Sequence, residues 1–258
     1  MEYAAELHDF LIEDLLAWYP ELAGKFKITL VEAMPHVLPM FSKRLIEYTE
    51  THFAKCEVSI LNNTAVKKVN EKDITIQDSK TKVEAQLPYG LLVWATGNTA
   101  RPVVSDLIKR LPADVQNQRR GVVVDDTLAV KGTDGIFALG DASATKWAPT
   151  AQVASGQGRY LANYFNSIAR LADKSPEAIS ALKTQLGPFN YNHIGTLAYI
   201  GADTAIADLP GNVHIGGALT YYFWRSAYLS NLFATRNRVL VGFDWMKKLV
   251  FGRDISRE

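Results

Sequence analysis

Two acidic residues lie where open α/β sheets bind ligands. Glu32 closes the β-rich run 27–33, and Asp141 closes the apolar run 135–141 directly after Gly140. A carboxylate at the end of a Rossmann strand accepts charge-assisted hydrogen bonds from a ribose diol, and a neighbouring glycine lets a ligand approach the backbone. The residues alone leave two interpretations open for each: a ligand-binding carboxylate, or a solvated strand-end acid for Glu32 and a helix-capping acid for Asp141.

A predicted helix start follows Asp141. Thr150, Ala151 and Gln152 open a stretch with helical period that runs to Leu171. The first turn of a helix has free N–H groups and the positive end of the helix dipole, which suit an electron-rich ligand edge. The glycine turn G-x-G-x-x-G that accompanies a ribose-binding acid is absent from the sequence, so the residues alone give no complete dinucleotide fingerprint.

The elements that must position these residues alternate between helices and strands. Apolar spacing predicts a helix over 4–16 that ends before Pro20, and a second helix over 43–54. Three short alternating runs in succession predict an antiparallel meander, and the continuous apolar run 90–97 predicts a strand buried on both faces. The predicted strands are 27–33, 58–61, 65–69, 73–77, 82–87, 90–97, 121–125 and 135–141.

The second half of the chain continues with helices around one hairpin. Ser175 and Pro176 are typical of a helix start, with serine as the cap and proline in the first turn. The runs 194–200 and 204–209 predict a hairpin, and the aromatic-rich stretches 218–234 and 239–251 predict two final helices. We place domain boundaries near Asn98 and Pro188.

Composition excludes several classes of protein. The 258 residues are 48% hydrophobic and 21% charged with a net charge of +1, which indicates a globular chain and argues against a nucleic-acid partner. The single Cys56, expected to be a small core residue, excludes an intramolecular disulfide, and the five scattered histidines predict no metal site. The first residues carry no recognisable targeting signal, and no apolar run is long enough to span a membrane.

The C-terminal segment 216–258 carries seven basic and three acidic residues, which gives it a charge of +4. On a helical wheel its last helix has an apolar stripe, with Asp244 and Lys248 opposite and Trp245 at the flank. The stripe consists of Val239, Gly242, Phe243, Met246, Leu249 and Val250. This pattern predicts an interfacial anchor on anionic lipid; the alternative is a stripe packed on the protein body or on a second subunit.

Five motifs resemble the carboxyl half of the type II, non-proton-pumping NADH:ubiquinone oxidoreductases, over nearly the whole chain. The motifs are WATG at 94–97, GIFALGDASA at 135–144, PTAQVAS at 149–155, YFWRSAYLSNL at 222–232 and FGRDISR at 251–257. The last motif is similar to external-facing mitochondrial members of fungi and plants. The resemblance implies an α/β fold: part of a two-dinucleotide flavoprotein of the FAD/NAD(P)-binding, Rossmann-like type, with a C-terminal amphipathic membrane-anchoring segment.

The resemblance also assigns roles to individual residues. Asp141 would bind the ribityl and pyrophosphate region of FAD, with Gly140 giving clearance, and Glu32 would hold the adenine ribose of NADH. Ala95, Thr96 and Gly97 would form a crossover loop near both cofactors, Ala151 and Gln152 would meet the isoalloxazine and the quinone mouth, and Gln152, Trp224 and Tyr228 would line the quinone pocket. No acid–base catalytic residue is implied, because the flavin carries the redox chemistry.

The helix after Asp141 departs from the family pattern A-Q-x-A-x-Q. Gly156 stands four residues after Gln152, and Gln157 follows one place late. One residue turns a helical side chain by about 100°, so we expect Gln157 to point away from the face that carries Gln152.

The resemblance also implies where the protein acts and how the chain is divided. It implies a peripheral protein of the mitochondrial inner membrane, on the intermembrane-space side, with ubiquinone, anionic lipid and a second copy as partners. Similar proteins begin with two glycine loops that this chain lacks, so we expect an N-terminally truncated enzyme. Its parts would be the rear of an NADH-binding domain (1–97), the rear of an FAD-binding domain (98–188) and a C-terminal hairpin with amphipathic helices (189–258).

Two alternatives remain at this point. The first alternative is a catalytically incompetent module that only associates with membranes or dimerises. The second is another two-dinucleotide reductase, such as a ferredoxin or sulfide reductase. Sulfide chemistry needs paired redox cysteines, and Cys56 is alone.

Overall fold

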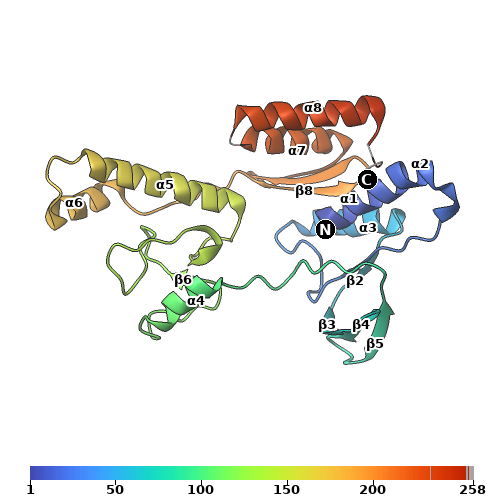
Figure 1. Cartoon of the computed structure of the whole chain (residues 1–258), viewed down its shortest axis with the longest axis horizontal. Helices are drawn as coiled ribbons and strands as arrows, with labels where there is room; N and C mark the ends of the chain where they lie inside the picture. The colour runs from blue at the N-terminus through green and yellow to red at the C-terminus, as the bar shows by residue number, and fades with distance from the viewer. Residues whose placement is uncertain (233, 254, 256–258) are drawn as a thin grey trace. The chain divides into compact units, whose positions relative to one another are not determined.

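The computed structural model describes residues 1–232, 234–253 and 255, and its chain divides into two compact units. The first unit contains residues 1–92 and 193–258, and the second contains residues 93–192. Figure 1 shows the elements of both units in chain order by colour.

The first unit is built from three small sheets and the helices that cover them. Its elements are α1 (Glu2–Asp9), the π-helical η1 (Phe10–Leu15), α2 (Leu16–Trp18), η2 (Pro20–Leu22), β1 (Thr29–Val31), α3 (Lys43–Lys55), β2 (Ser59–Leu61), β3 (Thr64–Val69), β4 (Asp73–Asp78), β5 (Glu84–Pro88), β8 (Thr196–Gly201), β9 (Thr204–Leu209), β10 (Val213–Gly217), α7 (Ala218–Asn231) and α8 (Thr235–Phe251). The predicted helices over 4–16 and 43–54 are confirmed within a few residues at each end.

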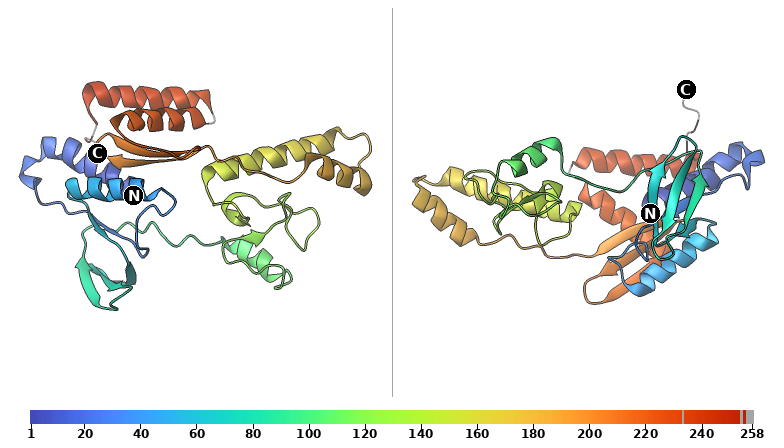
Figure 2. Two further views of the ribbon diagram at one scale, coloured as in Figure 1. Left: turned by 180° about the vertical axis from the view of Figure 1, so that it is seen from behind. Right: turned by 90° about the horizontal axis from the view of Figure 1, so that it is seen from below.

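The C-terminal sheet forms the centre of the first unit. The predicted hairpin is confirmed as β8 and β9, and β10, which the sequence did not predict, adds a third antiparallel strand in the order β10-β9-β8. Figures 1 and 2 show α7 on one face of this sheet and α1 and α3 on the other, with α8 lying over α7. The core therefore joins both ends of the sequence; its buried members are Ala5, Phe41, Leu45, Ile46, Phe53, Val58, Ala198, Tyr199, Ile200 and Ile206.

Two other sheets complete the first unit. β1 and β2 pair in parallel, with α3 as the connection between them. β3, β4 and β5 form the predicted antiparallel meander, with a register shift between Val66 and Lys68. Cys56 packs half-buried against the core, and burial raises the pKa of its thiol.

The second unit has little sheet. Its elements are α4 (Pro102–Lys109), β6 (Val122–Val123), the 3₁₀ turn η3 (Gly140–Ala142), β7 (Ser143–Ala144), α5 (Ala151–Arg170) and α6 (Pro176–Leu186). β6 and β7 form a two-residue parallel pair, and α5 and α6 lie side by side (Figures 1 and 2). Ser175 caps α6 as predicted, because its side chain accepts the N–H of Ala178 at 3.3 Å.

Two predicted strands, at the start of the second unit and within it, are wrong. Residues 90–97 form no strand and are largely exposed, and residues 135–139 join no sheet, apart from one bridge between Ala129 and Phe137. The predicted strand 121–125 shortens to β6. A strand needs a neighbouring ladder for its backbone N–H and C=O groups, and no described strand lies beside these runs.

The two final helices, α7 and α8, are 14 and 17 residues long and carry polar residues among their apolar ones. Among the described residues, no helix combines the length and the hydropathy that crossing a bilayer requires.

Candidate functional site

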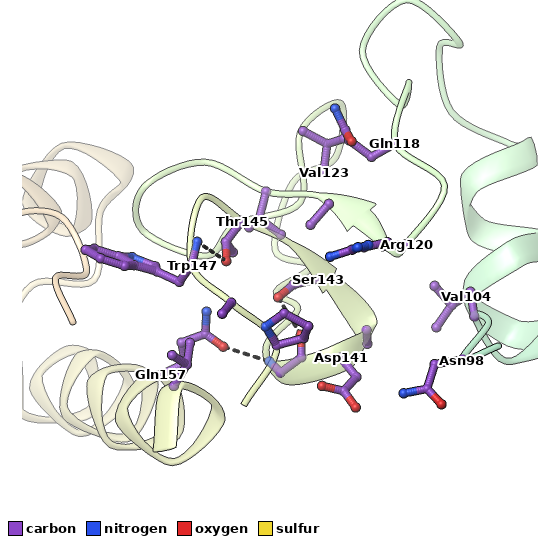
Figure 3. A pocket seen from close by; sticks show the side chains of 18 of the residues that line it. Asn98, Val104, Gln118, Arg120, Val123, Asp141, Ser143, Thr145, Trp147 and Gln157 are labelled. Atoms are coloured by element: carbon purple, nitrogen blue, oxygen red, sulfur yellow. Dashed lines mark hydrogen bonds between the residues drawn. The ribbon is translucent and has the colours of Figure 1, made fainter. Parts of the chain in front are cut away.

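A large cavity lies within the second unit. It has a volume of about 1530 Å³ and is bounded by the loop after residue 94, the turn η3 with the segment that follows it, and the start of α5. Figure 3 shows its lining from close by. Five of the predicted site residues lie in this lining: Ala95, Thr96, Gly97, Gly140 and Asp141.

The turn that carries Asp141 is tightly held. Gly140 has a φ of +60°, a conformation that side chains with a Cβ rarely adopt, and a Cβ placed there would lie 3.3 Å from the Ala154 Cβ. The Ser143 hydroxyl donates to the Gly140 carbonyl at 2.9 Å and closes the turn. A Cβ at Gly121 would lie only 2.5 Å from the Ala142 carbonyl oxygen, so the backbone packs directly on the other side. Asp141 is exposed at the middle of this fixed turn.

The start of α5 reaches the cavity through its cap. Thr150 lines the cavity, and its hydroxyl accepts the N–H of Val153 at 3.3 Å. Ala151 and Gln152, which the sequence assigns to the site, are the next two residues, but their side chains are not part of the lining. Their backbone N–H groups have no acceptor within the helix, as is usual in a first turn. The Gln152 side chain is engaged elsewhere, because its Oε1 accepts the Tyr191 hydroxyl at 2.6 Å.

Charges of both signs line the cavity. They are Arg101, Arg120, Asp125, Asp126, Asp141 and Lys146. Burial acts to raise the pKa of Asp125, but hydrogen bonds from Thr127, Lys183 and Ala129 outweigh it and hold that pKa below its ordinary value. The Lys183 ammonium lies 2.9 Å from the Asp125 carboxylate, so this acid is neutralised within the protein. Asp141 has no such partner among the described residues and remains available to a ligand.

Gln157 and Arg120 are among the cavity residues that sequence reasoning missed. Gln157 lies in the lining and accepts the Gly140 N–H, whereas the sequence showed only that its side chain leaves the Gln152 face. Arg120 lines the cavity from the loop before β6, and no local pattern in the sequence distinguishes it from its neighbour Arg119. The position of Arg120 depends on the fold of the loop.

Glu32 lies in the first unit, directly after β1. Its Oε1 accepts the Met34 N–H at 2.8 Å, which closes a small turn at the carboxyl end of the strand. Its backbone N–H donates to Leu61, the last residue of β2, and its carbonyl accepts from Thr64, the first residue of β3. The carboxylate thus stands at the carboxyl edge of a parallel pair, the place where α/β sheets bind ligands.

Trp224 and Tyr228 lie on α7 within an aromatic cluster of the first unit. Their ring centroids are 4.7 Å apart, and Trp224 also stacks on Tyr199 at 5.3 Å. The Trp224 indole donates to the Glu2 carboxylate at 3.2 Å, which fixes it against α1. Burial raises the pKa of the neighbouring Tyr221 to about 12. Tyr228 keeps about half of its surface exposed and is more accessible than Trp224, the other predicted quinone-pocket residue on α7.

A second surface, the apolar face of α8, is formed by side chains that the first unit does not cover. Leu249 and Phe251 are 88% and 84% exposed. The remaining members are Val239, Leu240, Phe243, Met246 and Val250. The opposite side is attached through Lys248, 3.9 Å from Glu13, and through Arg225, 4.1 Å from the centre of the Trp245 ring. The stripe is therefore not packed on the body of its own unit.

Two models of known protein families match the sequence, one over its first part and one near its C-terminus. The model for pyridine nucleotide-disulphide oxidoreductases matches residues 1–158, and the model for the NDH2 C-terminal domain matches residues 193–254.

Curated relatives come from fungi and plants. An external alternative NADH-ubiquinone oxidoreductase of Yarrowia lipolytica is 49% identical and aligns with 100% of this chain and 50% of its own length. A probable NADH-ubiquinone oxidoreductase of Schizosaccharomyces pombe is 46% identical, over 99% of this chain and 51% of its own. Both are named as mitochondrial. The chain thus spans about half the length of the curated relatives it matches.

A solved structure of NDH2 from Plasmodium falciparum in complex with NADH shares the fold, with a TM-score of 0.88 and 23% identity over 99% of this chain and 64% of that one. This likeness confirms the α/β dinucleotide-binding fold. The chain therefore belongs to the pyridine nucleotide-disulphide oxidoreductase family, and the resemblance to type II NADH:ubiquinone oxidoreductases is confirmed.

Proposed function

We propose that these residues serve an FAD-dependent oxidoreductase that passes electrons from NADH to ubiquinone without pumping protons. The observation that carries the proposal is the cavity of the second unit, where the Asp141 turn and the start of α5 meet. The names of the fungal relatives agree with this activity.

The residues of the cavity fit a flavin dinucleotide. The volume of about 1530 Å³ suits a large ligand, and two left-handed glycines, Gly97 and Gly140, are part of its wall. Asp141 offers an acceptor for ribityl or ribose hydroxyls, and the Arg120 and Lys146 side chains in the lining suit a pyrophosphate. The free N–H groups of Ala151 and Gln152 suit a carbonyl edge.

Hydride acceptance from NADH and reduction of a quinone are the chemistry that FAD supplies when bound. This chain's own residues bind and orient. Asp141 and Gly140 would hold the flavin, the loop of Ala95, Thr96 and Gly97 would lie near both cofactors, and Glu32 would hold the NADH ribose. Trp224 and Tyr228, on α7 of the first unit, would contact the quinone. The three parts are then 1–97 for NADH, 98–188 for FAD, and 189–258 for membrane or dimer contact.

Replacement of Asp141 tests the flavin site. Asp141→Ala removes a charge-assisted hydrogen bond worth on the order of 1.5–3 kcal/mol, so the Kd for FAD, measured by quenching of flavin fluorescence, should rise about tenfold or more. Asp114→Ala, an exposed acid of the same unit outside the cavity lining, is the matched control and should bind FAD like the wild type. Equal affinity of both variants would remove Asp141 from the site.

The apolar face of α8 supports a further part of the proposal, peripheral attachment to anionic lipid. Its uncovered side chains suit the acyl boundary, and the basic residues of the segment suit lipid headgroups. With relatives named external and mitochondrial, the site of attachment would be the mitochondrial inner membrane on the intermembrane-space side. A second copy of the chain on the same face is the competing outcome.

Liposome flotation separates these outcomes. The chain should float with vesicles that contain anionic lipid, and raising salt from 0.1 to 1 M should weaken flotation without abolishing it, since the Debye length falls from about 10 to about 3 Å. Leu249→Ser with Phe251→Ser should abolish the salt-resistant part, whereas Val103→Ser, an exposed position of the second unit, should not. Flotation unchanged by the double substitution, with loss of a dimer instead, would assign the face to a second copy.

A further inference from the structure

Gln157 is a polar side chain buried beside the cavity. It is only 1% exposed, although it lies on the face of α5 that lines the cavity. A buried amide is costly unless its hydrogen-bonding groups are used. Its Oε1 accepts the Gly140 N–H at 2.7 Å, whereas its Nε2 donates to no described residue. One half of the amide is therefore engaged, and the other half is available to whatever fills the cavity.

The engaged half holds the turn that carries Asp141. Figure 3 shows Gln157 reaching from α5 toward this turn, with the hydrogen bond drawn. The Gly140 N–H has its acceptor in this side chain, and the turn is closed on its other side by Ser143 and packed against Gly121. Of these three attachments, only the Gln157 hydrogen bond comes from α5. Removing the amide would therefore remove the hydrogen bond between this helix and the turn.

Gln152 cannot substitute for Gln157. It lies on another face of α5, its Oε1 accepts the Tyr191 hydroxyl at 2.6 Å, and its side chain is not part of the lining. A turn of about 140° around the helix separates two residues that are five positions apart. The two glutamines of the helix therefore serve different partners.

We propose that Gln157 is a positioning residue for the flavin site, with two functions. Its Oε1 fixes the Gly140 turn and thereby the direction of Asp141, and its Nε2 donates a hydrogen bond to a carbonyl or hydroxyl oxygen of the bound flavin. The second function rests on the proposed flavin site, whereas the first concerns the chain alone.

Two substitutions separate these functions. Gln157→Glu keeps an acceptor for the Gly140 N–H but loses the Nε2 donor, and Gln157→Met loses both at similar size. The readouts are amide hydrogen exchange of Gly140 by NMR in the flavin-free chain and the Kd for FAD by fluorescence quenching. Gln185→Met, at an exposed position of α6, is the matched control.

We expect Gln157→Met to accelerate Gly140 exchange at least tenfold and Gln157→Glu to leave it near the wild-type rate. Both should raise the Kd for FAD by about tenfold, while Gln185→Met changes neither quantity. If the wild-type chain binds FAD and both variants bind it equally well, the donor function is wrong but the flavin site stands. If the wild type binds no FAD, the proposed flavin site and the donor function both fail. Unchanged Gly140 exchange in Gln157→Met overturns the anchoring function in either case.

Discussion

The two units differ in how fully their strands find partners. In the first unit, β8 and β9 pair at five positions and bury Ile200, Ala205 and Ile206 almost completely. In the second, the only described pair of strands is two residues long, and Ile136 and Leu139 stay exposed outside any strand. Apolar runs occur in both units. The difference shows that such a run becomes a strand only where another strand satisfies its backbone.

The largest expected effect concerns the core of the first unit. Phe53→Ala removes a side chain that is 1% exposed and should lower the free energy of unfolding of that unit by about 3–5 kcal/mol. Hydrogen exchange of the β8 and β9 amides as a function of urea gives this value. Leu128→Ala, equally buried in the second unit, is the counterpart and should destabilise residues 93–192 instead. Equal destabilisation of both units by either change would show that they unfold as one.

A smaller effect is expected at the buried acid that joins α1 to the C-terminal sheet. Asp9 is 4% exposed and accepts the Tyr199 hydroxyl and, at 3.0 Å, the Ala202 N–H. Burial and this acid raise the pKa of Tyr199, so the hydroxyl keeps its proton and donates. Tyr199→Phe should cost about 1.5–3 kcal/mol in urea unfolding, since Asp9 loses a donor without gaining water. The exposed Tyr222→Phe is the control, and equal stability of the two variants would show that the Asp9 contact contributes nothing.

The smallest effect is a pH dependence in the second unit. Asp125 has a lowered pKa, so its ionised form contributes stability above the ordinary value near 3.9 and loses it as the pH falls through the lower folded value. Because its side chain is 36% exposed, Asp125→Asn should cost only about 0.5–1 kcal/mol at pH 7. The difference from wild type should shrink below about pH 4. A difference that grows on acidification would contradict the assignment; Asp134→Asn, at an exposed acid, controls for net charge.

The sequence predicted the elements that depend on local signals. The helix over 43–54, the meander and the Ser175 cap need only spacing, turn residues and a capping hydroxyl, and all three are present. The runs 90–97 and 135–141 have equally good local signals but no described neighbouring strand. The sequence pattern alone therefore wrongly predicted strands there. β10 was missed because its sequence, with glycines at 216 and 217, has little β propensity and is held by β9.

The residues of the site also divide into those that a local signal predicts and those that depend on tertiary packing. Asp141 and Gly140 were predicted from a Gly-Asp pair at the end of an apolar run, and they line the cavity although that run is not a strand. The partnership of Gln157 with Gly140 joins residues 17 positions apart and follows from how α5 packs on the turn, which no spacing rule contains. The Tyr191 bond to Gln152 spans 39 positions and was equally invisible.

The central claim is that the second unit contains the flavin site. Hydrogen–deuterium exchange of the chain with and without FAD tests it most directly, because it reports where the ligand binds. Bound FAD should slow exchange in segments 95–101, 118–126 and 140–153, which contain most of the residues that line the cavity, and leave α6 and the meander β3–β5 unchanged. Protection confined to the first unit, or no protection at FAD concentrations that saturate binding, would contradict the claim.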